Sequence, residues 1–323
     1  MGRLKILFVT NTTIPNSRYG GISRLVYNLA KALYKLNNDI IFLSPPGSYS
    51  DFGVMYHSDK YRINDNVFDS VDIIHFNESP KMDIKKPHIV TLHTLNDNGN
   101  KLSTNSVFIS RKHASLYNSN VFVHPGLDWD SYPTPDLNKP REGLLFLGND
   151  TIISKNLDGA ISVANRAKTI LNVIGNSISY AYSIPSKNNI KLYGYLEDDQ
   201  KVSILDNTKA LIFPITKHET FGLAVIEAMY YGNYILGTPY GALPEIIDQY
   251  TGFLNIDASI LADKFNSLNV NRKICNDRAI DLFSASVSAK KYLILYQRIL
   301  DGEKLHTCHP VLGYKQDTLP WKQ

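Results

Sequence analysis

The sequence predicts an α/β protein of two domains, each built on a parallel β-sheet with helices on both faces. Short apolar runs recur along the chain and alternate with helical patterns, which is typical of parallel strands that are buried on both faces. The chain has 323 residues, more than one hydrophobic core usually organises. Four prolines between residues 125 and 140 indicate a linker between two such series of elements.

The first series begins with a nearly continuous apolar run at residues 4–10, which predicts a buried strand. A polar loop with two adjacent glycines follows. Apolar residues then recur every three or four positions over residues 25–36, which predicts a helix with one buried face. A strand at residues 39–43 completes a βαβ unit. Further strands of this series are expected at residues 71–76, 88–93, 106–110 and 120–124.

The second series repeats the alternation after the proline-rich stretch. Strands are expected at residues 143–148, 171–175, 190–194, 210–213 and 234–238, with helices at 157–169, 198–206 and 220–231 and a helical pattern beyond 258. We therefore expect a Rossmann-like domain at residues 1–135 and a second at 140–302. The tail, residues 303–323, is expected to pack back on the first domain.

Composition excludes several classes of protein. Hydrophobic residues at 43% and charged residues at 20% are ordinary for a folded protein, and a net charge of +4 is far below that of a dedicated nucleic-acid binder. No apolar run approaches the roughly 20 residues that span a bilayer, and the apolar opening is too short for a signal peptide. Cys275 and Cys308 cannot form a disulfide framework. We expect a cytoplasmic protein with no integral membrane segment.

The most specific motif lies in the stretch KHETFGLAVIEAMYYGNYILGTPYGALPEII, residues 217–247. Seven residues separate Glu219 from Glu227. This spacing resembles the EX7E motif of retaining GT-B glycosyltransferases of family 4. Residues 19–33 are similar to that family's glycine loop and first helix, and VTLHT at 90–94 is similar to its strand that ends in histidine. The resemblance covers most of residues 4–256 and implies the GT-B fold, in which two parallel sheets face each other across a cleft.

A site for a nucleotide-sugar has physical requirements that can be stated without the resemblance. The diphosphate of the donor gains negative charge as it leaves, and helix N-termini and cations stabilise that charge. Gly20 and Gly21 precede the first helix, where a side chain would block the approach of a phosphate. The alternative is that these glycines serve only the backbone angles of the loop.

The resemblance assigns roles to particular residues. Lys155 matches the lysine that contacts the donor phosphates, Glu219 the glutamate beside the sugar hydroxyls, and His93, at a strand end, a histidine near the donor sugar. These three are the expected catalytic residues. Carboxylates suit hydroxyl binding because each accepts two donors. The expected donor-binding residues are Gly20, Gly21, Tyr195 near the nucleobase, His218, Phe221, Gly222, Leu223 and Glu227, the last on the ribose.

The chain departs from the family at one position. An arginine commonly follows the glycine at the end of the strand before Lys155, whereas this chain has Asn149 and Asp150 there. One cation for the phosphates is therefore missing or comes from elsewhere. The candidates are Arg18, Arg24 and Lys217.

The resemblance also implies the mechanism. Such enzymes use a front-face displacement in which the leaving phosphate takes the acceptor proton, so neither a catalytic base nor a metal or other cofactor is expected. The acidic triplet at residues 128–130 is interpreted as structural. His306, Cys308 and His309 lack a second ligand cluster that would complete a zinc site.

We therefore expect a retaining hexosyl- or pentosyltransferase that uses a UDP- or GDP-sugar and a hydroxyl acceptor, with a saccharide or small molecule as the default. A dehydrogenase is rejected because no GxGxxG follows a strand. Two alternatives stay open: a catalytically weak nucleotide-sugar binding module, and a transferase acting on hydroxymethylated bases in DNA. The DNA alternative needs a flipped base and cations on the phosphates. The candidate cations are Arg111, Lys112, Lys139 and Arg141.

Overall fold

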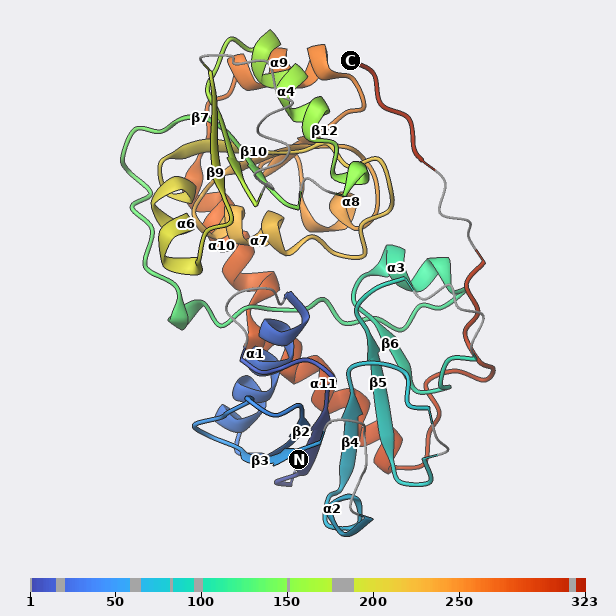
Figure 1. Cartoon of the computed structure of the whole chain (residues 1–323). Helices are drawn as coiled ribbons and strands as arrows, with labels where there is room; N and C mark the ends of the chain where they lie inside the picture. The colour runs from blue at the N-terminus through green and yellow to red at the C-terminus, as the bar shows by residue number, and fades with distance from the viewer. Residues whose placement is uncertain are drawn as a thin grey trace. The chain divides into compact units, whose positions relative to one another are not determined.

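The computed structural model describes residues 2–15, 21–58, 65–81, 84–95, 101–149, 152–175, 189–313 and 318–323. The chain forms two compact units, Met1–Ser131 with Leu282–Tyr314 and Tyr132–Asp281 with Lys315–Gln323. Each unit contains a six-stranded sheet in which neighbouring strands are parallel (Figure 1). The predicted fold class, two Rossmann-like domains, is confirmed.

The sheet of the first unit has the strand order β3-β2-β1-β4-β5-β6. Its central strand β1 (Lys5–Val9) is fully buried from Ile6 to Val9, because helices cover both faces of a parallel sheet. The other strands are β2 (Asp39–Ser44), β3 (Val54–His57), β4 (Ile73–Phe76), β5 (His88–Leu92) and β6 (Ser106–Phe108). The helical elements are α1 (Gly21–Lys35), α2 (Asp65–Asp69), α3 (Arg111–Leu116), the short 3-10 helix η1 (Trp129–Ser131) and α11 (Ala285–Leu300).

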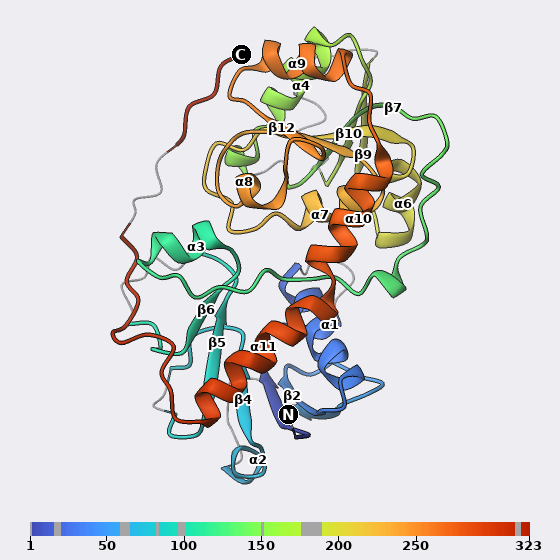
Figure 2. The same ribbon diagram turned by 180° about the vertical axis from the view of Figure 1, so that it is seen from behind.

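Helix α11 belongs to the first unit, so the prediction that placed residues 282–302 in the second domain is wrong. Its apolar side contributes Ala289, Tyr292 and Tyr296 to the core that also holds Ile6 and Phe8 of β1. Figure 2 shows α11 lying across the strands β4 and β5, with α1 beside it. An apolar helix face in the sequence does not specify which of two similar sheets it covers, and this pairing is decided only by tertiary packing.

A chain of buried hydrogen bonds fastens α11 to the sheet. The His75 ring on β4 bonds through Nδ1 to Tyr296 Oη at 2.6 Å and through Nε2 to Thr91 Oγ1 at 2.7 Å. Thr91 Oγ1 in turn meets Tyr292 Oη at 2.7 Å. Burial lowers the pKa of His75 to about 3, so the ring is neutral at pH 7. The network satisfies polar groups that would otherwise be buried without partners.

The second unit has the strand order β12-β11-β10-β7-β8-β9, with β7 and β10 in the middle of the sheet. Its strands are β7 (Glu142–Leu147), β8 (Leu171–Ile174), β9 (Ile190–Gly194), β10 (Thr208–Phe213), β11 (Tyr234–Gly237) and β12 (Gly252–Leu254). Its helical elements are η2 (Ile153–Lys155), α4 (Leu157–Arg166), α6 (Asp198–Leu205), α7 (Leu223–Tyr230), α8 (Leu243–Ile246), α9 (Ala258–Asn266) and α10 (Arg272–Phe283).

Three local expectations differ from the structure. The apolar run at 120–124 forms only an isolated bridge from Phe122 to Phe108, and the short strands β3 and β12 were not predicted. The tail divides between the units instead of packing on the first alone. His306 bonds to Ser119 and Thr104 in the first unit, whereas the last residues bond to Thr216 and Ile256 in the second. Among the residues that the structure describes, no helix has the length and hydropathy needed to cross a bilayer.

We predict that the first unit loses stability in weak acid. Burial lowers the pKa of both His75 and His113 to about 3 from 6.5, so between these values the unfolded chain takes up protons that the folded unit does not. Stability is therefore full above pH 6.5 and falls as the pH drops, by about 1.4 kcal/mol per pH unit for each histidine. Urea unfolding at pH 7.5 and 5 measures this free energy, followed by the fluorescence of Trp129, the only tryptophan left in a Trp321→Phe background.

In the same assay, His75→Gln is expected to reduce the pH dependence, because one of the buried imidazoles that stay neutral in the folded unit is gone. His57→Gln, at an exposed position on β3, is the control and leaves the dependence unchanged. Equal unfolding free energies at the two pH values would contradict the buried neutral state of these histidines.

Candidate functional site

Two predicted catalytic residues, Lys155 and Glu219, meet in the second unit. Lys155 ends η2 in the segment after β7, and Glu219 lies in the loop after β10, so both follow central parallel strands at their carboxyl ends. Lys155 Nζ forms an ion pair with Glu219 Oε2 and lies 5.3 Å from the centroid of the Phe213 ring at the end of β10. The two side chains are 20% and 25% exposed, so the pair is open to solvent and can be reached by a ligand.

The segment that carries Lys155 is fixed by its neighbours. Asn156 adopts a left-handed conformation with φ 58°, accepts from the Gly159 N–H at 3.0 Å and donates to the Pro214 carbonyl at 2.9 Å. Its side chain therefore caps α4 and joins this segment to the loop after β10. A second link runs from the Thr216 N–H to the Ser154 carbonyl at 2.9 Å.

The loop that carries Glu219 is clamped by the segment after β11. The Gly241 N–H donates to His218 Nδ1 at 3.0 Å, and the Ala242 N–H donates to the Glu219 carbonyl at 3.1 Å. Since Nδ1 accepts a hydrogen bond, the neutral His218 ring carries its proton on Nε2. Gly241 has φ 59°, and a Cβ atom there would overlap the backbone of Glu219. Only glycine fits this close approach.

Helix α7 begins beside the ion pair. Its N-cap is Gly222, with φ 105°, and a Cβ atom on Gly222 would lie 3.8 Å from both Glu219 Cγ and the Phe213 ring. Phe221 is buried at 2% exposure and anchors this turn, and Leu223 is the first helical residue. The helix N-terminus therefore lies next to Lys155 and Glu219, where the N–H groups of the first helical turn and the helix dipole favour an anion.

Glu227 lies in the second turn of α7 and is almost fully buried, at 3% exposure. Lys201 on α6 donates to Glu227 Oε1 at 3.1 Å, and the Tyr132 hydroxyl donates to the same oxygen at 3.1 Å. Lys201 and Tyr132 were not predicted from the sequence as partners of Glu227. The available signal was a lysine on the same side of the predicted helix as Leu205, four positions away, where an apolar residue is expected.

The remaining predicted residues are dispersed. Tyr195 follows β9 in the second unit and is 47% exposed. His93 and Gly21 belong to the first unit, and Gly20 lies outside the described residues. Gly21 is the first residue of α1, whereas His93 follows β5 and donates from Nε2 to Asn77 Oδ1 at 3.1 Å. Burial lowers the pKa of His93 to about 4, so its imidazole is neutral at pH 7.

The structure shows where two of the three cations lie that were expected as a second partner for the donor phosphates. Lys217 shares the loop of His218 and Glu219 in the second unit, and Arg24 lies on α1 in the first. Arg18 and Asp150 lie outside the described residues, whereas Asn149 is described and exposed.

The structure corrects one part of the DNA alternative. The side chain of Arg141 is fully buried and bonds to Asp206, to which Lys139 also pairs at 2.5 Å. Arg141 therefore cannot contact a phosphate of DNA.

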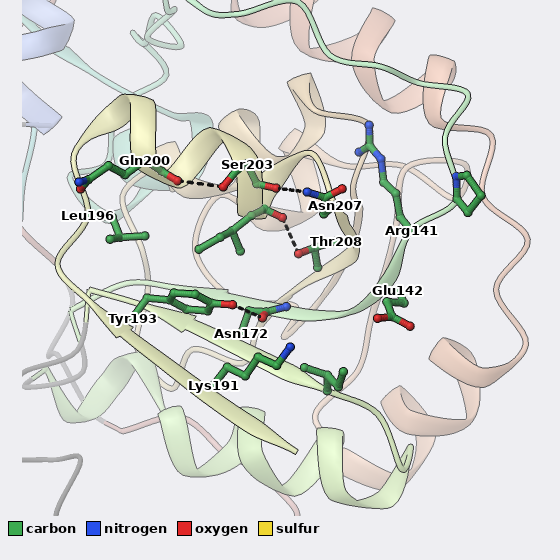
Figure 3. A pocket seen from close by; sticks show the side chains of 13 residues that line it. Arg141, Glu142, Asn172, Lys191, Tyr193, Leu196, Gln200, Ser203, Asn207 and Thr208 are labelled. Atoms are coloured by element: carbon green, nitrogen blue, oxygen red, sulfur yellow. Dashed lines mark hydrogen bonds between the residues drawn. The ribbon is translucent and has the colours of Figure 1, made fainter. Parts of the chain in front are cut away.

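A groove of about 800 Å³ lies elsewhere on the second unit (Figure 3). It runs beside α6 and the first residues of β7, β8 and β10, whereas Lys155 and Glu219 follow the opposite ends of β7 and β10. Two hydrogen bonds lie within its lining: Tyr193 Oη donates to Asn172 Oδ1 at 3.1 Å, and Asn207 Nδ2 donates to the Ser203 carbonyl at 2.6 Å. The groove is separate from the cluster around Lys155.

Several known proteins are similar to this chain. Residues 133–278, just under half of the chain, match the family model described as glycosyl transferases group 1. AviGT4, a glycosyltransferase involved in avilamycin A biosynthesis, superposes with a TM-score of 0.77 at 17% identity over 93% of this chain and 99% of that chain. Sucrose-phosphate synthase of Thermosynechococcus elongatus superposes with a TM-score of 0.69 at 16% identity, over 93% of this chain and 100% of that chain. Anabaena HepE in complex with UDP and glucose superposes with a TM-score of 0.68 at 13% identity, over 91% of this chain and 100% of that chain. The fold is therefore that of GT-B glycosyltransferases.

Two further relatives are similar in sequence, and their identity to this chain is higher than that of the solved structures. A protein of the cps region of Klebsiella pneumoniae is 27% identical over 173 residues, which is 50% of this chain and 48% of that protein, so the match spans about half of its length. An uncharacterized glycosyltransferase of Methanocaldococcus jannaschii is 24% identical over 322 residues, 83% of this chain and 88% of that protein.

We predict that Gly241→Ala lowers the free energy of unfolding of the second unit. The loss is expected to exceed the cost of placing an alanine in a left-handed backbone conformation. The new methyl group would overlap the Glu219 backbone, so the two loops must separate and lose their hydrogen bonds. Gly194→Ala is the matched control, since Gly194 also has a left-handed φ of 68° but no neighbour within 4 Å of a Cβ atom. Strain alone costs about 1–2 kcal/mol. Urea unfolding followed by Trp321 in a Trp129→Phe background measures both, and equal losses would contradict the clamp.

Proposed function

We propose that this protein is a retaining glycosyltransferase that transfers a sugar from a UDP- or GDP-sugar to a hydroxyl group of a saccharide or small molecule. The observation that carries the proposal is the Lys155–Glu219 ion pair beside the N-terminus of α7, with Glu227 buried one turn further on. All three residues lie within the stretch that matches the glycosyltransferase model. UDP is the first nucleotide to test because the HepE structure contains UDP and glucose.

In the proposed mechanism, the donor diphosphate replaces Glu219 as the partner of Lys155. The pair is partly exposed and loses little when it separates, since ion pairs in contact with water contribute about 1 kcal/mol or less. Lys155 and the N–H groups at the start of α7 then stabilise the charge that grows on the leaving phosphate. Glu219, released from Lys155, accepts hydrogen bonds from the hydroxyls of the donor sugar.

The acceptor proton has a destination within the same site. In a front-face displacement, the acceptor oxygen attacks the anomeric carbon from the side that the phosphate leaves, and the departing phosphate oxygen takes the proton. The C–O bond to phosphate breaks as the new C–O bond forms on the same face, so the configuration is retained. Glu227 binds the ribose hydroxyls in this proposal.

We further propose that Lys155 supplies the positive charge that a metal ion supplies in other phosphate-binding sites. Turnover is then expected to persist in EDTA. Loss of turnover on chelation, with recovery on adding Mg²⁺ or Mn²⁺, would overturn this part of the proposal.

The first experiment titrates the purified protein with UDP, GDP, ADP and their sugar derivatives and measures thermal stabilisation. A ligand at 100 times its Kd stabilises the folded state by about 2.7 kcal/mol, which raises the unfolding temperature measurably. We expect a shift with one nucleotide and its sugar derivative, together with slow release of free sugar from that donor. Flat curves for the whole panel would contradict a nucleotide-sugar site, and binding without sugar release or transfer would favour a catalytically weak binding module.

We predict that Lys155→Ala lowers the rate of donor turnover by roughly a hundredfold, as removal of a single electrostatic contact to a leaving group does. The reason is that the leaving phosphate loses its nearby cation while the fold keeps the loop bonds of Asn156 and Thr216. Lys273→Ala is the control, because Lys273 on α10 pairs only with Asp277 in its described contacts and is exposed. The measurement is the initial rate of donor consumption by the wild type and by both variants. Full activity of Lys155→Ala would remove Lys155 from the mechanism.

A further inference from the structure

Lys201 is a charged residue on the buried side of α6, with 7% of its surface exposed. Its ammonium group contacts two carboxylates, Glu227 Oε1 at 3.1 Å and Asp198 Oδ1 at 2.6 Å. Asp198 lies one turn earlier on the same helix and is 47% exposed, whereas the side chain of Glu227 is 4% exposed. The lysine therefore joins a buried carboxylate on α7 to one at the solvent edge of α6.

The Glu227 carboxylate is held in a defined direction. Lys201 and the Tyr132 hydroxyl both donate to Oε1, from two different segments of the second unit, α6 and the stretch after Ser131. Two donors on one oxygen fix the plane of the carboxylate and favour its ionised form. Charge-assisted hydrogen bonds of this kind are shorter and stronger than neutral ones.

Stability does not account for this arrangement. A buried lysine–glutamate pair loses its hydration, and a well-packed apolar pair of similar volume usually stabilises a protein as well or better. Helices α6 and α7 already flank apolar core residues such as Leu205 and Val225, so an apolar contact between the helices is available. The ion pair is better explained by what it does to Glu227 than by what it contributes to folding.

We propose that Lys201 is the positioning residue of the nucleotide site: it keeps the Glu227 carboxylate ionised and fixed in direction, so that Glu227 accepts the two ribose hydroxyls of the donor. This inference rests on the proposed function. It adds a cause for specificity, because a fixed acceptor discriminates between a ribose and a sugar that lacks the hydroxyls, whereas a freely rotating or protonated carboxyl group does not. Lys201 itself does not touch the ligand.

The test compares the affinities for UDP and for 2′,3′-dideoxy-UDP, and likewise for the GDP and ADP pairs, by titration calorimetry. The wild-type protein is expected to bind its preferred nucleotide roughly tenfold to a hundredfold more tightly than the dideoxy form, since a buried acceptor would otherwise lose its donors. Glu227→Ala is expected to bring the ratio of the two affinities, ribose form to dideoxyribose form, close to one. Lys201→Met is expected to do the same, although it removes no group that contacts the ligand.

Two further variants separate positioning from general damage. Arg141→Met is the matched control: it also removes a buried cation of the second unit, one that bonds to Asp206 after α6 and to the Tyr231 carbonyl after α7. It is expected to lower stability and leave the ribose-to-dideoxyribose ratio within threefold of the wild type. Lys201→Arg keeps the positive charge and is expected to retain most of the ratio, while Lys201→Gln loses it; this pair decides the question if Lys201→Met does not fold.

The outcomes distinguish the two proposals. A wild-type protein that binds none of the nucleotides overturns the proposed function and the role of Lys201 with it. A wild-type protein that discriminates, with a Lys201→Met or Lys201→Gln variant that discriminates equally well, overturns only the role of Lys201. A collapse of the ratio in Arg141→Met as large as in the Lys201 variants would also overturn it, because the effect would then be structural.

Discussion

The parallel arrangement of the strands is the constraint on which the candidate site depends. In a parallel sheet every carboxyl end lies at the same edge, so segments far apart in sequence emerge next to one another. In the second unit, the segments after β7, β10 and β11 carry Lys155, Glu219 and Gly241, respectively. Hydrogen bonds between their backbones and the side chain of Asn156 then join these segments. The site is thus a property of the sheet edge, and each loop contributes one part of it.

The two lysine–glutamate pairs of this unit differ in the property that matters for their proposed roles. The Lys155–Glu219 pair is about one-fifth to one-quarter exposed and stands beside the N-terminus of α7, so water and an anionic ligand can compete for the lysine. The Lys201–Glu227 pair is less than one-tenth exposed and is supported by Tyr132, so its partners are fixed. One pair is suited to exchange and the other to orientation. The same chemistry therefore serves two purposes because the burial differs.

The first unit shows a different use of buried polar groups. Eight of the nine histidines lie in it, and the ring of His75 is joined to Thr91 and to the tyrosines of α11. Helix α11 is far from β4 and β5 in sequence, and the hydrogen-bond network specifies where it docks on a surface that is otherwise apolar. Thr91 precedes His93 by two residues on the chain, so this network also supports the strand end that carries a predicted catalytic residue.

The sequence by itself determined the fold class and most strands of both sheets, because apolar periodicity is a property of adjacent residues. It also indicated that Lys155 and Glu219 follow strands of the same sheet, and the structure shows them paired. It did not determine that α11 covers the first sheet, that the last residues pack on the second unit, or that Lys201 and Tyr132 hold Glu227. An apolar face or a buried lysine is visible in the sequence, but its partner is chosen by packing between segments distant in the chain, and only the tertiary structure decides that choice.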